Sequence, residues 1–96
     1  MKLIVSARAF GELNEAVDYL LERNPVAAVT LHDQIMTAFK RLTVCPRSGS
    51  PTTHPGLRRV VLTDFPYTIY YRPAEGRIEI ISIFANARDP GDAPAN

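Results

Sequence analysis

The sequence has only one cysteine and no long apolar run, and each shortage excludes a class of protein. A single cysteine, Cys45, cannot form an internal disulfide, and a reducing cytoplasm suits such a chain. No stretch approaches the roughly 18 apolar residues that a membrane span needs, and the start of the chain turns polar too early for a signal peptide. Cys45 and two distant histidines do not make a zinc site, and no glycine-rich phosphate loop is present. We therefore expect no metal and no cofactor.

The chain also lacks a large excess of charge of either sign, because its net charge is only +1. Whole-chain electrostatics therefore do not argue for nucleic acid. The local distribution is more informative. Residues 9–39 have five acidic side chains against Arg23 alone, whereas residues 40–63 have no acid and five bases, namely Lys40, Arg41, Arg47, Arg58 and Arg59. Such a split favours a charged partner on one side of the molecule.

The composition that remains is that of an ordinary globular protein, and 96 residues make one domain. Hydrophobic periodicity predicts two amphipathic helices and four strands. Ser6 can cap the first helix, and Asn24 with Pro25 can begin the second. Between helix and strands, three prolines and two glycines predict an irregular loop at residues 45–56. The expected strands are 2–5, 57–62, 67–72 and 77–84, and the expected helices are 7–22 and 25–44.

The order of these segments predicts an α+β domain of two layers over residues 1–90. The short link between the helices makes them an antiparallel hairpin, which must bury its apolar stripes on the sheet. The sheet is expected to be mainly antiparallel, with the first strand beside one of the three late ones. Residues 91–96 are rich in proline and small side chains and are expected to form a flexible tail.

The register of the last two strands follows if Arg72 and Arg77 face each other across a Pro73–Gly76 turn. Tyr71 then opposes Ile78, and Tyr67 opposes Ser82. This pairing places Ile69, Tyr71, Ile78, Ile80 and Phe84 on the face that carries the helices. It places Thr68, Tyr70, Arg72, Glu79, Ile81 and Ile83 on a half-open face.

Three segments in order resemble one family of small proteins. They are "RLTVCPRSGSP", "GLRRVVLTDFPYTIYYR" and "IEIISIFANARDP". With the order of the elements, they make residues 2–90 similar to the RelE/ParE superfamily of toxins from type II toxin–antitoxin systems. The resemblance implies a cytoplasmic toxin, often part of a plasmid stabilisation system, that an antitoxin neutralises by wrapping an extended segment around it. DNA is then reached only indirectly, through the antitoxin.

Two activities occur in the superfamily, so the resemblance leaves two targets open. RelE-like members cleave mRNA on the ribosome without a metal, and ParE-like members inhibit DNA gyrase. RelE-like toxins typically use lysine and arginine with a tyrosine or histidine near the C-terminus. Here the last lysine is Lys40, the last tyrosine is Tyr71, and Ala85 stands where relatives often have a histidine. Arginine stays charged and is a poor proton shuttle. This departure favours a ParE-like inhibitor over a nuclease.

Five residues are candidates for binding an antitoxin or a target: Arg58, Arg59, Tyr70, Arg72 and Arg88. Arg58 and Arg59 alternate along a strand, so only one can reach the open face. Arg72 lies beside Tyr70, although a pair with Glu79 or Glu75 is the structural alternative. Arg88 can instead anchor the chain end on backbone carbonyls. If the protein is a nuclease, the four arginines among these are its only candidate catalytic residues.

Overall fold

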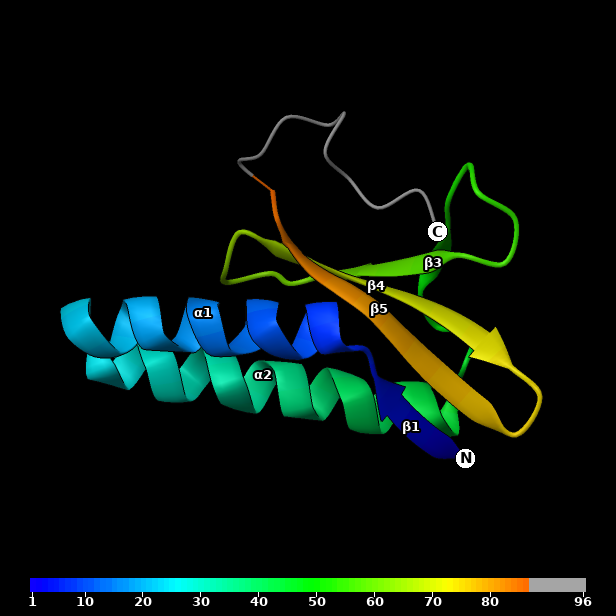
Figure 1. Cartoon of the computed structure of the whole chain (residues 1–96), viewed down its shortest axis with the longest axis horizontal. Coiled ribbons are helices and arrows are strands. Elements are labelled where there is room, and N and C mark those ends of the chain that lie inside the picture. Colours follow the sequence, from blue (N-terminus) through cyan, green and yellow to red (C-terminus); the bar gives the residue numbers. More distant parts are fainter. Residues whose placement is uncertain (87–96) are drawn as a thin grey trace.

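The computed structural model describes residues 1–86, and in this range two helices lie on one side of a five-stranded sheet (Figure 1). The α+β prediction is confirmed. The helices are α1 (Ala7–Arg23) and α2 (Pro25–Val44). The strands are β1 (Lys2–Val5), β2 (Ser50–Pro51), β3 (Arg58–Val61), β4 (Tyr67–Ala74) and β5 (Arg77–Ala85). The expected tail, residues 91–96, lies outside the described residues.

Both helices begin at the capping residues that the sequence indicates. The Ser6 hydroxyl accepts a hydrogen bond from the Ala9 N–H at 3.0 Å, and the Asn24 side chain accepts one from the Ala27 N–H at 3.2 Å. Ser6 also donates to the Ile81 carbonyl at 2.9 Å. The cap of α1 therefore also ties the helix to β5.

The strand order is β1-β5-β4-β3-β2, with β1 parallel to β5 and the other neighbours antiparallel. The expected place of the first strand beside a late strand is confirmed. The expected irregularity of residues 45–56 is wrong at one point, because Ser50–Pro51 pairs with Arg58–Arg59 as a short edge strand. A proline is compatible with this position because an edge strand needs bonds on one side only.

The expected register of β4 and β5 is wrong by two residues next to the turn. Only Glu75 and Gly76 form the turn, with Gly76 at a φ of +71°, so Ala74 pairs with Arg77 and Arg72 with Glu79. Pro73 can stay in β4 because β3 begins at Arg58, opposite Tyr71, and has no strand residue opposite Pro73 that needs its N–H.

A bulge then changes the register again further along these two strands. Tyr71 pairs with Ile80 but Tyr70 pairs with Ser82, which leaves Ile81 as an extra residue on β5. The bulge exchanges two expected positions: Ile83 belongs to the main core, and Phe84 instead meets Tyr70 edge to face at 6.3 Å.

The core lies between the helices and the sheet, and it contains most of the side chains that periodicity predicts. Ile69, Tyr71, Ile78 and Ile80 are fully buried on the sheet, as expected. The helices contribute Ala9, Leu13, Ala16, Leu31, Ile35, Phe39 and Leu42. On the same helices, Phe10, Leu21 and His32 are exposed.

Beyond β1, the free edge of β5 is covered by a side chain of α1. One oxygen of Glu12 accepts hydrogen bonds from the Ser82 hydroxyl at 2.7 Å and the Ile83 N–H at 3.0 Å. Arg8 lies 3.6 Å from the other oxygen. A backbone donor that the short β1 cannot reach is therefore satisfied from the helix layer.

Candidate functional site

Three of the predicted residues lie together on the open face, the side of the sheet away from the helices. Arg59 of β3 pairs in register with Tyr70 of β4, and Arg72 lies two residues further along the same strand. Alternation along β4 places Tyr70 and Arg72 on the side opposite the buried Ile69 and Tyr71. We call Arg59, Tyr70 and Arg72 the open-face cluster.

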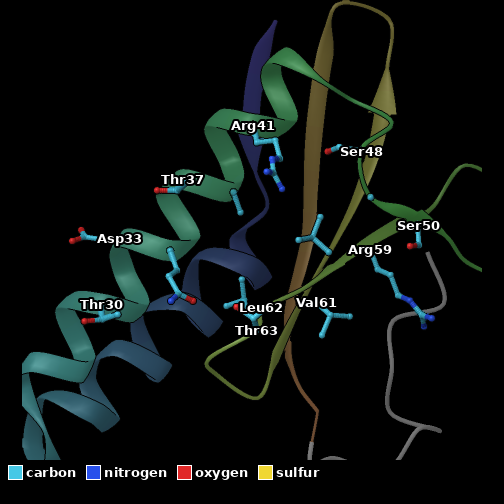
Figure 2. A pocket seen from close by; sticks show the side chains of 14 residues that line it. Thr30, Asp33, Thr37, Arg41, Ser48, Ser50, Arg59, Val61, Leu62 and Thr63 are labelled. Carbon is cyan, nitrogen blue, oxygen red and sulfur yellow. The ribbon is translucent and has the colours of Figure 1, made fainter.

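The expectation that only one of Arg58 and Arg59 reaches this face is confirmed. Arg59 is exposed and points away from α2 (Figure 2). The side chain of Arg58 is half-buried and is used inside the protein. Its guanidinium donates to the Gly49 carbonyl at 3.0 and 2.6 Å and to the Arg47 carbonyl at 3.0 Å. Arg58 is therefore a structural residue that holds the loop between α2 and β3.

Tyr71 holds the same loop from the neighbouring strand. Its hydroxyl donates to the Pro46 carbonyl at 2.8 Å and accepts from the Gly49 N–H at 2.9 Å. Gly49 is needed for this approach, because a Cβ there would lie 2.6 Å from both the Arg59 carbonyl oxygen and the Tyr71 hydroxyl. The loop beside the open-face cluster is thus fixed by buried contacts rather than by its own sequence.

The structural alternative for Arg72, a pair with a nearby glutamate, is wrong within residues 1–86. Glu79 stands opposite Arg72 in register, but its carboxylate binds Arg77 at 2.8 Å. No carboxylate of the described residues lies within 4.0 Å of an Arg72 nitrogen. Within residues 1–86, the guanidinium of Arg72 therefore has no carboxylate partner, as a contact with an external anion requires.

A groove runs along the edge of the sheet between α2 and β3, with a volume of about 620 Å³. One wall includes Ala38 and Arg41 of α2. The other includes Val60 of β3 and Leu62, the residue that follows this strand. Figure 2 shows Arg41 extending from α2 on the side of the loop that carries Ser48. We call this feature the edge groove.

The floor of the edge groove includes an unpaired stretch of strand. The Leu62 N–H donates to the Tyr67 carbonyl, so the backbone groups of the preceding Val61 point away from β4. The short β2 covers β3 only at Arg58 and Arg59. Among residues 1–86 no strand pairs with this side of Val61, which is 56% exposed and therefore offers an edge to an added strand.

The remaining candidates do not form a second site. Arg88 lies outside the described residues. Among residues 1–86 no three His, Cys, Asp or Glu side chains are grouped to hold a metal ion, and no helix is long and apolar enough to cross a membrane. His32 is exposed 3.6 Å from Asp33, and Cys45 is exposed as well.

Sequence reasoning missed Gly49, Tyr71 and Arg58 as the residues that fix the loop. In the sequence, Gly49 indicates only a loop, and Tyr71 is predicted only as a core residue. These three residues come together because β2 pairs with β3. That pairing was not predicted, because the prolines of residues 45–56 indicate an irregular loop.

Comparison with known proteins agrees on one family. Residues 3–90 match the family described as "ParE toxin of type II toxin-antitoxin system, parDE". The chain is 36% identical over 76 residues to a Sinorhizobium fredii protein named "Putative toxin Y4kP", covering 79% of this chain and 78% of that protein. A solved structure titled "Chromosomal ParDE TA system from P. aeruginosa" superposes with a TM-score of 0.76 at 25% identity, covering 88% of this chain and 95% of that one.

Proposed function

Because the chain belongs to the ParE toxin family of type II toxin–antitoxin systems, we propose that it is a cytoplasmic toxin that inhibits DNA gyrase by binding. The open-face cluster makes the contact in this proposal, and a cognate antitoxin neutralises the toxin through the edge groove. The observation that carries the proposal is the pair of arginines, Arg59 and Arg72, beside the half-buried Tyr70.

Such a cluster is better suited to binding than to proton transfer. Arginine and tyrosine are enriched at the centres of protein interfaces, where a planar guanidinium binds carboxylates with two hydrogen bonds. Cleavage of RNA without a metal needs groups that take up and release protons, and a guanidinium stays charged. The side chains of the open-face cluster therefore favour an inhibitor that holds an acidic surface of its target.

A gyrase assay with purified protein tests this function. The protein is expected to inhibit supercoiling of a relaxed plasmid, and Arg72→Ala is expected to weaken inhibition by about tenfold or more, as for a central interface arginine. Arg23→Ala is the matched control, because Arg23 lies at the end of α1, close to Glu22 and over the ring of Tyr19. Thermal unfolding of each variant shows that the fold is kept.

One outcome of these assays would contradict inhibition of gyrase. If supercoiling is unaffected while translated mRNA is cut at defined positions, the protein is a RelE-like ribonuclease and the gyrase proposal is wrong. Mapping of mRNA ends after induced expression, together with staining of the nucleoid, separates the two targets in cells.

The edge groove supports the second part of the proposal, binding of the antitoxin. Its walls combine apolar side chains with Arg41, and the free edge at Val61 can pair with an extended segment. An apolar segment with acidic residues fits both features. We expect such an antitoxin to be encoded beside the toxin.

Binding of the antitoxin can be tested apart from toxicity. Ala38→Gln inserts a polar side chain into the edge groove and is expected to weaken the complex by about tenfold or more, because it leaves a desolvated amide unpaired. Val29→Gln is the matched control, because Val29 is exposed on α2 and does not line the edge groove. Isothermal titration with the antitoxin measures both variants. Equal losses in the two would place the antitoxin elsewhere.

A further inference from the structure

Most cations of this protein fall into two groups. Arg8, Arg23 and Arg77 each lie within 4.0 Å of a glutamate oxygen. A second group of six, drawn from residues 40–72, has no carboxylate within that distance among residues 1–86. We call this second group the basic end; it consists of Lys40, Arg41, Arg47, Arg58, Arg59 and Arg72.

Five members of the basic end gather around the loop between α2 and β3. Arg58 binds the backbone carbonyl of Arg47. Arg41 and Arg59 line the edge groove on its opposite walls. The Arg72 Nε lies 3.8 Å from where a Cβ on Gly56 would be, at the far side of the loop. The sixth member, Lys40, precedes Arg41 at the exposed end of α2.

Acidic residues are absent from the segment that makes most of this surface. Residues 40–63 contain no aspartate or glutamate, whereas Glu12, Glu15, Asp18 and Glu22 all lie on α1. Like charges held together by the fold repel one another, and a bound polyanion would remove that repulsion. The net charge of +1 conceals this local excess.

We propose that the basic end binds the phosphodiester backbone of duplex DNA directly, without the antitoxin. The exposed hydroxyls of Ser48 and Ser50 lie among the cations and can donate to phosphate oxygens, as such side chains commonly do beside arginine. Protein interfaces instead have an apolar or aromatic centre, and the loop itself presents polar side chains and prolines. This replaces the expectation that DNA is reached only through the antitoxin.

Binding through phosphates has a characteristic dependence on salt. Fluorescence anisotropy with a short labelled duplex, between about 50 and 200 mM salt, is expected to give a log–log slope of about −4.5 to −5.4 for about five or six neutralised phosphates. The double variant Arg41→Ala/Arg47→Ala is expected to weaken binding by about tenfold and to reduce the slope by about 2. Neither residue belongs to the open-face cluster.

A matched double variant, Arg8→Ala/Arg23→Ala, removes the same charge from the paired group and is expected to stay within about twofold of the parent. Equal weakening in both double variants would show that only net charge matters and would overturn the site. Absence of binding at about 50 mM salt, or tighter binding of a poly-glutamate peptide than of the duplex, would overturn the choice of DNA. The assay contains no gyrase, so its outcome is independent of the proposed inhibition.

Discussion

At the scale of single residues, two neighbours in sequence have opposite tasks. Arg58 uses its guanidinium to bind the carbonyls of Arg47 and Gly49, whereas Arg59 projects from the sheet. Strand alternation predicts that the two differ, but the sequence does not say which one is turned inward. The choice follows from the position of Gly49, which only the pairing of β2 with β3 determines.

Tyr71→Phe tests how firmly the loop is held. The variant leaves the Gly49 N–H and the Pro46 carbonyl without their partner, so the free energy of unfolding is expected to fall by about 1–3 kcal/mol. Urea denaturation measures the change. Tyr19→Phe is the control, because Tyr19 is exposed, and a loss above about 0.5 kcal/mol there would show that the assay does not isolate the loop.

Arg58→Lys keeps the charge but removes the fork of donors. One ammonium cannot reproduce three hydrogen bonds to two carbonyls from the same position, so we expect a loss of about 1–3 kcal/mol. Hydrogen exchange should quicken at the Gly49 N–H, since the loop opens more often. Stability equal to that of the parent would mean that Arg58 does not hold the loop.

At the scale of elements, helices were easier to predict than strand pairing. Both caps, the helix bounds within one residue and all four long strands follow from local patterns. The register of β4 and β5 does not, because it depends on a two-residue turn at Gly76 and on the extra residue Ile81. A bulge leaves no local signal in a run of β-branched residues.

Alanine substitutions at two glycines are expected to change stability in opposite directions. Gly11 lies inside α1, and a methyl group added to it would meet nothing within 4 Å, so Gly11→Ala is expected to stabilise the protein by about 0.4–1 kcal/mol. Gly49→Ala is expected to destabilise it by about 1–3 kcal/mol, because the new Cβ overlaps the Arg59 carbonyl and the Tyr71 ring. Thermal unfolding compares the two, and a shift of the same sign in both would contradict the packing at Gly49.

Ser6→Ala examines the junction between α1 and β5. The variant loses the cap on the Ala9 N–H and the donor to the Ile81 carbonyl, so a loss of about 1–2 kcal/mol is expected. Thr43→Ala, which removes one exposed hydrogen bond at the end of α2, should cost less than about 0.5 kcal/mol. If the two losses are equal, Ser6 contributes nothing beyond an ordinary exposed hydroxyl.

At the scale of the whole molecule, the surface divides into regions of different use. The open-face cluster and the edge groove lie on two sides of β3, and Arg59 belongs to both. The family and the two-layer fold could be predicted from the sequence, because they depend on the order of elements. The groove could not be placed, because it exists only where the short β2 leaves β3 uncovered.

The parallel pairing of β1 with β5 has a consequence for synthesis. Residues 2–5 can form their strand pairing only after residues 77–80 have been synthesised. The hydrogen bond from Ser6 to Ile81 likewise spans 75 positions of the chain. Contacts so distant in the chain form late in folding, after the local helical hairpin. A ribosome must therefore release almost the entire chain before the sheet is complete. Translation stopped before β5 leaves no finished open face, so a truncated product is expected to be harmless to the cell that makes it.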